Sequence, residues 1–287
     1  MLPDVLIPAR DANPADLDRA VRSALGVAGP GHVVVIDDAS SPPLDLGGLA
    51  SGVRLVRSEV HLGVSAARNL AIEHASRDLL LFLDADDVLL RAGVRSMVAL
   101  LARAGAVAGV AARHELRRPN PGEAPRLRLR PVPAEWADSI LPTPADAFRP
   151  IAIFGSSGLL VRRGVPDLRF DPDLEIGEDR DLVARLARHG PVVLSADPAL
   201  VVTLHGRGGA NLTSDRRLER RIRDHLVLMA RHFDHASAQH FGEATRWLIN
   251  RASRARVGDE AWNALLRAAR DRRLPVPLKA RLRRRLA

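Results

Sequence analysis

The front half of the chain alternates two kinds of hydrophobic pattern. Short apolar runs recur at residues 4–8, 32–36 and 79–83, and VRLV at 53–56 is a further expected strand. Runs of this kind are typical of strands that are buried on both faces of a sheet. Between them, residues 14–25 and 65–75 place apolar side chains at helical spacing. Asn13 and Pro14 suit the start of the first helix, and Gly26 suits its C-terminal cap. Strands that alternate with helices predict an α/β fold with a mostly parallel sheet and right-handed crossovers.

The pattern changes in the second half. Residues 117–150 are rich in Pro and Arg and predict a long loop. Order returns with an apolar segment at 151–163, a helix over 178–189, and strands over 191–194 and 199–204. After Asn211 the chain is predicted to be helical, with interruptions near Gly258 and Pro275. We therefore expect an α/β domain over residues 1–213 and a helical C-terminal region over 214–287.

The composition excludes several classes of protein. Cysteine is absent, which excludes disulfide scaffolds, iron–sulfur clusters, cysteine zinc sites and thiol nucleophiles. Aromatic residues make up 3% of the chain and tyrosine is absent, so no platform for stacking nucleic-acid bases is expected. No run reaches the roughly 20 apolar residues of a membrane-spanning helix, and the N-terminus MLPDVLIPAR does not resemble a signal peptide. We expect a cytoplasmic protein without a nucleic-acid partner.

The positive charge is concentrated at the C-terminal end. Residues 215–287 carry 19 Lys and Arg against 8 Asp and Glu, a net charge of +11, whereas the whole chain carries +9. The first 214 residues therefore have a net charge of −2, so the high isoelectric point does not describe the ligand of the front domain.

Acidic and turn-forming residues follow three of the expected strands. Pro8 to Asp11 follow the first strand, Asp37-Asp38 the second, and Asp84 to Asp87 the fourth. In an open parallel sheet, ligands bind beyond the carboxyl ends of the strands. Three carboxylates within four residues favour a hard cation such as Mg²⁺ or Mn²⁺, which is held by one or two carboxylates and by substrate phosphates. Neither a G-x-G-x-x-G turn nor a G-x-x-x-x-G-K-[ST] loop is present, which argues against dinucleotide and P-loop sites.

Four segments together resemble family 2 glycosyltransferases. They are a first strand that ends at Pro8, then VVVIDDAS (33–40), HLGVSAARNLAI (61–72) and LLLFLDADD (79–87), with FDPDLEIGEDRDLVARLARHG (170–190) further on. The resemblance covers about residues 3–213 and implies a GT-A fold, a Rossmann-like, mostly parallel sheet flanked by helices. It divides this domain into a nucleotide-sugar half, about 1–112, and an acceptor half, about 113–213. It also implies inverting transfer from a nucleotide-sugar donor, with UDP favoured, to a hydroxyl acceptor in a glycan, a glycolipid or a small molecule.

The same resemblance assigns donor-binding roles. Pro8, Ala9, Arg10 and Asp11 would line the uridine pocket, and Asp38 would accept a hydrogen bond from uracil. Arg68 would reach the base or the diphosphate, Asp84 would meet the ribose, and Ala85 would lie beside it. Asp86 would bind the metal cofactor, Mn²⁺ or Mg²⁺, and His205 of LHGRGGANLT would approach the same ion.

It also assigns the acceptor side. Asp179 of GEDRD would be the catalytic base that takes the proton of the acceptor hydroxyl, because an inverting transfer needs one base. Gly155, Ser156 and Glu178 would contact the acceptor. Two features depart from the family: Ala9-Arg10 stands where an aromatic residue often stacks on the base, and a Gln-x-x-Arg-Trp segment is absent, which argues against a processive synthase.

Simpler interpretations stay open for several of these residues. Asp37 and Asp38 would also serve as turn residues, Asp87 as the cap of the following helix, and Asp179 as an acid that favours a helix dipole. Arg68 and Asp181 would also fit a solvated helix surface.

Alternatives also stay open for the whole chain. One is a nucleotide-sugar-binding protein that has lost activity; another is a basic protein that binds a membrane surface or nucleic acid. Residues 276–287 place Leu278, Leu282 and Leu286 on one helical stripe among basic side chains, which predicts peripheral contact with the inner face of a membrane. The competing interpretation is a C-terminal helix that packs these leucines on the protein body.

Overall fold

The computed structural model describes residues 1–117, 126–148, 155–204, 218–233, 238–255 and 257–277. Its strands are β1 (Asp4–Ala9), β2 (Val33–Asp38), β3 (Arg54–Ser58), β4 (Leu79–Phe82), β5 (Val88–Leu89), β6 (Ala108–Arg117), β7 (Arg126–Arg130), β8 (Ser139–Ile140), β9 (Leu160–Arg162) and β10 (Val192–Leu204). Its α-helices are α1 (Pro14–Ala28), α2 (Val64–Glu73), α3 (Arg91–Arg103), α4 (Glu178–Leu186), α5 (Leu218–His232), α6 (Ala238–Ala255) and α7 (Asp259–Asp271). Short 3₁₀ helices cover Gly47–Gly52, Ala134–Trp136 and Pro144–Phe148.

A single mixed sheet forms the centre of the molecule, in the order β3-β2-β1-β4-β9-β6-β10-β5, with β7 paired to β6 and β8 to β10. The strands β3, β2, β1 and β4 are parallel, which confirms the prediction for the front half. Beyond them, β9 runs antiparallel to both β4 and β6, while β10 runs parallel to β6. The sheet is therefore parallel in the half that carries the first three acidic segments and mixed in the other half.

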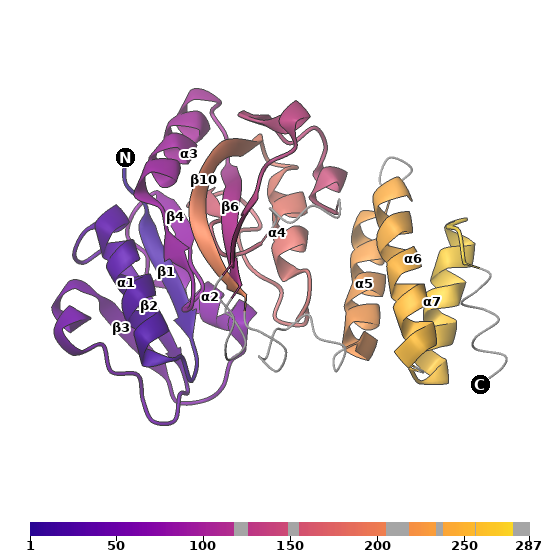
Figure 1. Ribbon diagram of the computed structural model, residues 1–287, viewed down its shortest axis with the longest axis horizontal. Coiled ribbons are helices and arrows are strands. Elements are labelled where there is room, and N and C mark those ends of the chain that lie inside the picture. The colour runs from indigo at the N-terminus through magenta and orange to yellow at the C-terminus, as the bar shows by residue number, and fades with distance from the viewer. Residues whose placement is uncertain (118–125, 149–154, 205–217, 234–237, 256, 278–287) are drawn as a thin grey trace.

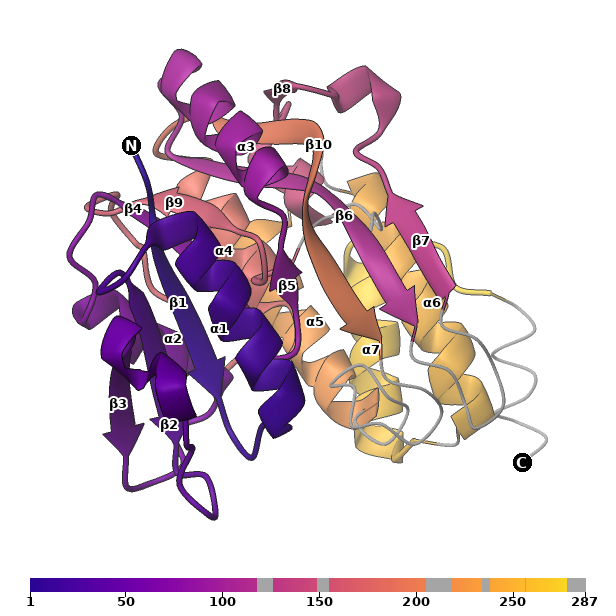
Figure 2. The ribbon, with the colours of Figure 1, turned by 60° about the vertical axis from the view of Figure 1, so that its left-hand side comes forward.

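Helices cover both faces of this sheet (Figure 2). Successive side chains of a strand point to opposite faces, so Leu80 and Phe82 of β4 join the core cluster on the side of α2 and α4. Leu79 and Leu81 join the cluster on the side of α1 and α3. All four side chains are at most 2% exposed. This double burial explains why the strand sequences are continuously apolar rather than alternating.

The C-terminal helices form a further layer beyond α4 (Figure 1). Ile222 of α5 and Phe241 of α6 are 1% exposed and belong to the same core cluster as Leu182 of α4. The ring of Phe148 lies 4.7 Å from that of Phe241. The helical region is thus packed on the α/β domain through α4 and the 3₁₀ helix Pro144–Phe148.

Three expectations about element boundaries were wrong. Helix α1 continues past Gly26 to Ala28, and Gly29, at φ 82°, provides the left-handed residue that ends it. Within 117–150, residues 126–130 form β7, an antiparallel partner of β6. The runs at 191–194 and 199–204 belong to one strand, β10, whose pairing with β6 shifts register between Ser195 and Leu200. A bulge of this kind bends a strand without ending it.

Membrane contact through residues 276–287 is not tested by the structure, because 278–287 lie outside the described residues. No helix in the described part of the chain has both the length and the apolar character of a membrane span.

Helix α3 crosses β10 at Gly93 with no space for a side chain. A Cβ at this position would lie 1.9 Å from the carbonyl oxygen of Pro198 and 2.8 Å from the Cα of Ala199. Because these are backbone atoms, they cannot rotate away. We expect Gly93→Ala to lower the free energy of unfolding by about 1–3 kcal/mol, measured from the urea midpoint. Gly26→Ala is the control, since a Cβ at Gly26 meets nothing within 4 Å; equal midpoints for the two variants would contradict this prediction.

Candidate active site

The carboxyl ends of β1 and β2 open into a cavity of about 520 Å³. Its walls come from these strand ends, from the first turn of α2, and from the segment that precedes α4. The lining residues are Pro8, Ala9, Arg10, Asp38, His61, Leu62, Gly63, Val64, Ser65, Ala66, Ala67, Pro172, Leu174, Glu175 and Arg220. Four residues expected to bind the nucleotide, Pro8, Ala9, Arg10 and Asp38, therefore share one cavity. The N–H groups in the first turn of a helix have no partners within that helix and favour anions, so α2 makes this cavity suitable for an anionic ligand.

Asp38 holds the loop that leads into α2. Its carboxylate accepts hydrogen bonds from the backbone N–H groups of Leu62 (2.6 Å) and Gly63 (3.0 Å) and contacts Nδ1 of His61 at 2.8 Å. The side chain is 4% exposed. Asp38 thus lines the cavity and also holds the backbone of Leu62 and Gly63, which form the adjacent part of its wall.

Asp37 has the local role that the turn interpretation predicts. Its carboxylate accepts hydrogen bonds from the N–H groups of Ser40 (2.9 Å) and Leu44 (3.1 Å) and pairs with Arg57 at 2.5 Å. Burial acts to raise the pKa of Asp37, but these hydrogen bonds outweigh it and leave that pKa below its usual value. The carboxylate stabilises the turn after β2.

Asp11 lies outside the residues that line the cavity. Its carboxylate accepts a hydrogen bond from Ser41 N–H at 2.9 Å, and its own N–H donates to Oγ of Ser40 at 3.0 Å. These bonds join the turns that follow β1 and β2. Its structural contribution in this arrangement is to hold those turns together beside the cavity.

The acidic segment after β4 lies at the same edge of the sheet. Asp84 and Asp86 are half-buried, whereas Asp87 is 2% exposed. Asp87 accepts a hydrogen bond from Thr203 N–H at 2.8 Å, and the Thr203 hydroxyl donates to the Asp86 carbonyl at 2.6 Å. Helix α3 begins after Leu90, which makes no side-chain cap, so the capping interpretation of Asp87 was wrong. Asp87 instead joins this segment to β10.

The chemistry of this segment suits a hard cation. Burial, followed by repulsion from Asp84 and then Asp86, raises the pKa of Asp87 to about 8. A divalent cation would relieve such repulsion, and Mg²⁺ or Mn²⁺ is commonly held by one or two carboxylates together with phosphate oxygens. Within the described residues, no group of three His, Asp or Glu side chains forms a complete metal site. Asp84 and Asp86 therefore fit a cation whose remaining ligands come from a phosphate-bearing substrate, and His205 lies outside the described residues.

Arg68 connects this acidic segment to the start of α4. Its guanidinium is 3% exposed and pairs with Asp84 at 2.8 Å and with Glu178 at 3.0 Å. It also lies over the ring of Phe170, 5.2 Å from the ring centre. The interpretation of Arg68 as a solvated helix residue was wrong. The structure places it beneath two site carboxylates, outside the residues that line the cavity.

Glu178 and Asp179 begin α4 and differ in environment. Glu178 is 7% exposed, and burial, with repulsion from Asp179, raises its pKa to about 7 in spite of Arg68. Asp179 is half-buried, and its Oδ1 accepts a hydrogen bond from Arg180 N–H at 2.7 Å. Its Oδ2 lies 4.0 Å from the position of a Cβ on Gly155. The proposed base and Gly155, an expected acceptor contact, are therefore neighbours.

Ser156 and Ser157 link this area to the acidic segment. Ser156 is 6% exposed, so this expected acceptor residue is buried next to Gly155. Oγ of Ser157 accepts a hydrogen bond from Asp84 N–H at 3.2 Å. The segment 155–157 thus runs from Asp179 to Asp84.

Several site residues were missed by the sequence analysis. Arg113 of β6 places Nη1 3.1 Å from the Cβ position of Gly155, and Arg220 of α5 lines the nucleotide-sized cavity, where it pairs with Glu175. Asp181 was expected on a helix surface but is completely buried. A single Arg in a strand or in a basic helix carries no local signal, so these positions were visible only once the fold was known.

Comparisons with known proteins agree with this arrangement. The family model described as "Glycosyl transferase family 2" matches residues 4–150. The succinoglycan biosynthesis protein ExoO of Rhizobium meliloti (strain 1021) is 29% identical over a 312-residue alignment that covers 99% of this chain and 87% of ExoO. Crystal structures of S. aureus TarS 1–349 superpose with a TM-score of 0.61 at 16% identity, both in complex with UDP-GlcNAc (98% of this chain, 83% of that one) and in complex with UDP (99% and 88%). The TarS likeness confirms the GT-A type of fold.

Proposed function

The chain belongs to glycosyl transferase family 2 and is a glycosyltransferase, and we propose that it transfers a sugar from a UDP-sugar to a hydroxyl acceptor with inversion at the anomeric carbon. The observation that carries this proposal is the juxtaposition of three features at one sheet edge. They are the cavity at the ends of β1 and β2, the acidic segment after β4, and Asp179 beside Gly155.

The donor half of the proposal rests on the cavity. Its volume of about 520 Å³ and the first turn of α2 in its wall suit a nucleoside diphosphate, whose negative charge a helix N-terminus favours. UDP is proposed as that nucleotide because the TarS structures with the same fold contain UDP or UDP-GlcNAc. A glycan acceptor is proposed because ExoO is a succinoglycan biosynthesis protein.

Asp179 is proposed as the base. The acceptor hydroxyl oxygen forms a bond to the anomeric carbon while the bond from that carbon to the diphosphate oxygen breaks, and its electron pair leaves with UDP. Asp179 takes the hydroxyl proton as attack proceeds. Arg68 pairs with Asp84 and Glu178 and so holds the acidic segment and the start of α4 in register. A divalent cation held by Asp86, with Asp84, would supply positive charge that stabilises the leaving diphosphate.

The proposed donor is tested by thermal unfolding in the presence of UDP, dTDP, GDP and ADP, each with and without Mn²⁺. A ligand that binds only the folded state stabilises it by about 2.7 kcal/mol at one hundred times its Kd. We expect UDP with Mn²⁺ to raise the midpoint most, and UDP alone to raise it less.

A matched pair of variants shows whether the shift comes from this cavity. Ala66 lines the cavity and Ala102 lies on α3 outside it, so Ala66→Trp should remove the UDP shift while Ala102→Trp keeps it. A larger shift with another nucleotide would replace UDP as the donor, and no shift with any nucleotide would overturn the proposed function.

A further inference from the structure

We propose that helix α5 is the positioning element of this active site, and that His232 and Asp224 are the two residues through which it acts. This inference rests on the proposed function only in naming Asp179 as the base; the anchoring itself concerns residues 171–181 and α5. It would give the C-terminal helical region a part in the transfer reaction although none of its proposed positioning residues touches the sugar.

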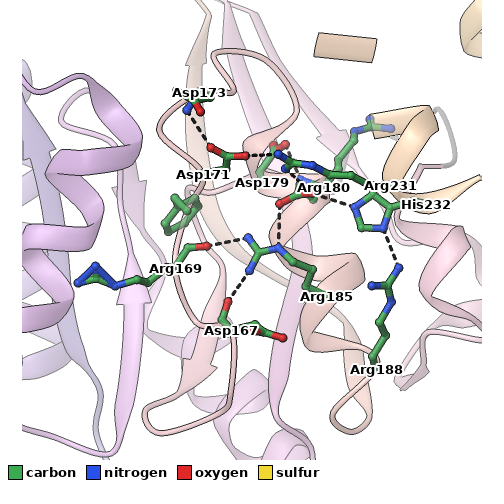
Figure 3. A network of polar contacts seen from close by, with 12 residues as sticks. Asp167, Arg169, Asp171, Asp173, Asp179, Arg180, Arg185, Arg188, Arg231 and His232 are labelled. Atoms are coloured by element: carbon green, nitrogen blue, oxygen red, sulfur yellow. Dashed lines mark hydrogen bonds and ion pairs between the residues drawn. The ribbon is translucent and has the colours of Figure 1, made fainter. Parts of the chain in front are cut away.

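The first anchor is the contact of His232 with α4, shown in Figure 3. Nε2 of His232 lies 2.8 Å from Oδ1 of Asp181, and Nδ1 lies 3.0 Å from Nη2 of Arg188. Because a guanidinium can only donate, Nδ1 is the acceptor and Nε2 carries the proton that is donated to Asp181. Both side chains are buried, at 4% and 0% exposure.

Asp181 is held by three side chains from two helices. Besides the hydrogen bond from His232, its carboxylate accepts one from Nε of Arg185 in α4 (2.8 Å) and one from Nη1 of Arg231 in α5 (3.4 Å). Burial acts to raise the pKa of Asp181, but the hydrogen bond from His232 and the charge of Arg185 outweigh it and lower that pKa to about 2. Arg231 also pairs with Asp171 at 2.6 Å, so α5 contacts the segment before α4 as well.

The second anchor is Asp224, which is completely buried. Its Oδ2 accepts hydrogen bonds from the N–H groups of Glu175 (3.2 Å) and Ile176 (3.1 Å), and its Oδ1 pairs with Arg223 at 2.7 Å. Glu175 lines the cavity. Asp224 therefore fixes the backbone of a cavity wall directly before the turn that carries Glu178 and Asp179.

The geometry separates the two sides of α4. Residues 179 and 181 are two positions apart, so they project from nearly opposite sides of the helix. Asp181 faces α5, whereas Asp179 faces Gly155. A shift of the first turn of α4 would therefore displace Asp179 relative to Gly155, and displacements of about 1 Å can cost roughly 100-fold in rate.

The test of the first anchor compares two buried histidines of the same helix. With backbone and side chain counted together, His225 and His232 are each 8% exposed, but Nε2 of His225 contacts Oγ1 of Thr245 in α6 at 2.8 Å. Burial lowers the pKa of His225 to about 4, so His225→Leu removes a neutral ring whose hydrogen-bond partner lies in α6 and not in α4. His232→Leu removes the donor to Asp181, and His232→Gln restores an N–H near the same place.

We expect His232→Leu to accelerate hydrogen–deuterium exchange of amides in residues 171–181 by about tenfold, the effect of one lost hydrogen bond. Release of UDP from UDP-GlcNAc or UDP-glucose should fall about tenfold or more, with the Kd for UDP changed less than this rate. His232→Gln should recover most of both effects, and His225→Leu should show neither, even if its melting midpoint falls equally.

The second anchor has a different signature. Asp224→Leu removes the carboxylate that accepts hydrogen bonds from the N–H groups of Glu175 and Ile176. Because Glu175 lines the cavity, this loss should weaken UDP binding by about tenfold. Asp224→Asn keeps one acceptor oxygen and should bind UDP more tightly than Asp224→Leu.

The outcomes separate this inference from the proposed function. Equal exchange in residues 171–181 for His232→Leu and His225→Leu would overturn the anchor, as would a loss of turnover that His232→Gln does not recover. If His232→Leu exchanges faster than the parent in residues 171–181, but the parent neither binds UDP nor releases it from UDP-GlcNAc or UDP-glucose, the anchor stands and the proposed function is overturned.

Discussion

Replacing Asp179 with Asn is expected to lower turnover by roughly 10²–10⁴-fold while the Kd for UDP stays nearly unchanged. Asn has the same shape and its oxygen can still accept the hydrogen bond from Arg180 N–H, but it cannot take a proton at neutral pH. General-base catalysis typically contributes this range of rate. The change is measured as UDP release at saturating donor, together with calorimetric titration of UDP.

The matched control is Asp173→Asn. Asp173 is an exposed acid in the segment before α4, so its replacement removes the same charge without touching the site. Near-normal turnover in Asp179→Asn would show that another group accepts the proton, and loss of UDP binding would make Asp179 a binding residue instead.

Replacing Asp86 with Ala is expected to abolish the gain in UDP affinity that the proposed metal role predicts for Mn²⁺. The segment is held to β10 through the Asp86 carbonyl and the Asp87 carboxylate, which both bond to Thr203, so the fold should survive the change. Mg²⁺ and Mn²⁺ at phosphate sites are commonly held by only one or two protein carboxylates. Loss of the Asp86 carboxylate would therefore remove much of the protein's hold on the ion. The ratio of UDP Kd values without and with Mn²⁺ measures the effect, and we expect it to fall to about one.

Asp197→Ala serves as the charge control, because Asp197 is an exposed acid in β10 outside the site. If Asp86→Ala retains the full Mn²⁺ effect, the cation is bound elsewhere. A lower melting midpoint without any change in the Kd ratio would give Asp86 a structural role only.

The part of the fold that local physics controls was predictable from sequence. Buried strands need continuous apolar runs, so β1, β2 and β4 were predictable from the sequence, whereas β3 lies at the sheet edge with Arg54 and Leu55 exposed. Asn13 accepts hydrogen bonds from Ala15 and Asp16 N–H, as an N-cap residue in its pattern should. The carboxyl ends of parallel strands meet at one sheet edge. The order of the segments along the chain therefore sufficed to predict that the acids after β2 and β4 lie at the same edge.

Partners that lie far apart along the chain were decided by tertiary structure alone. Arg68 and Glu178 are 110 positions apart, and Asp181 and His232 are 51 apart. Charged residues on a helix usually face water, so the sequence placed Asp181 on the surface and left a solvated position open for Arg68. Burial of such groups becomes favourable only where opposite charges and hydrogen-bond partners converge on them, and that convergence belongs to the packed molecule.

The family and the type of fold therefore follow from the sequence alone, because both depend on short segments of neighbouring residues. Only the tertiary structure decided that β9 lies between β4 and β6, that Arg220 lines the cavity, and that α5 holds the segment before Asp179. These features depend on which surfaces of distant segments are complementary in shape and charge. Periodicity within one segment reveals that it has a face to bury but does not identify the segment that covers it.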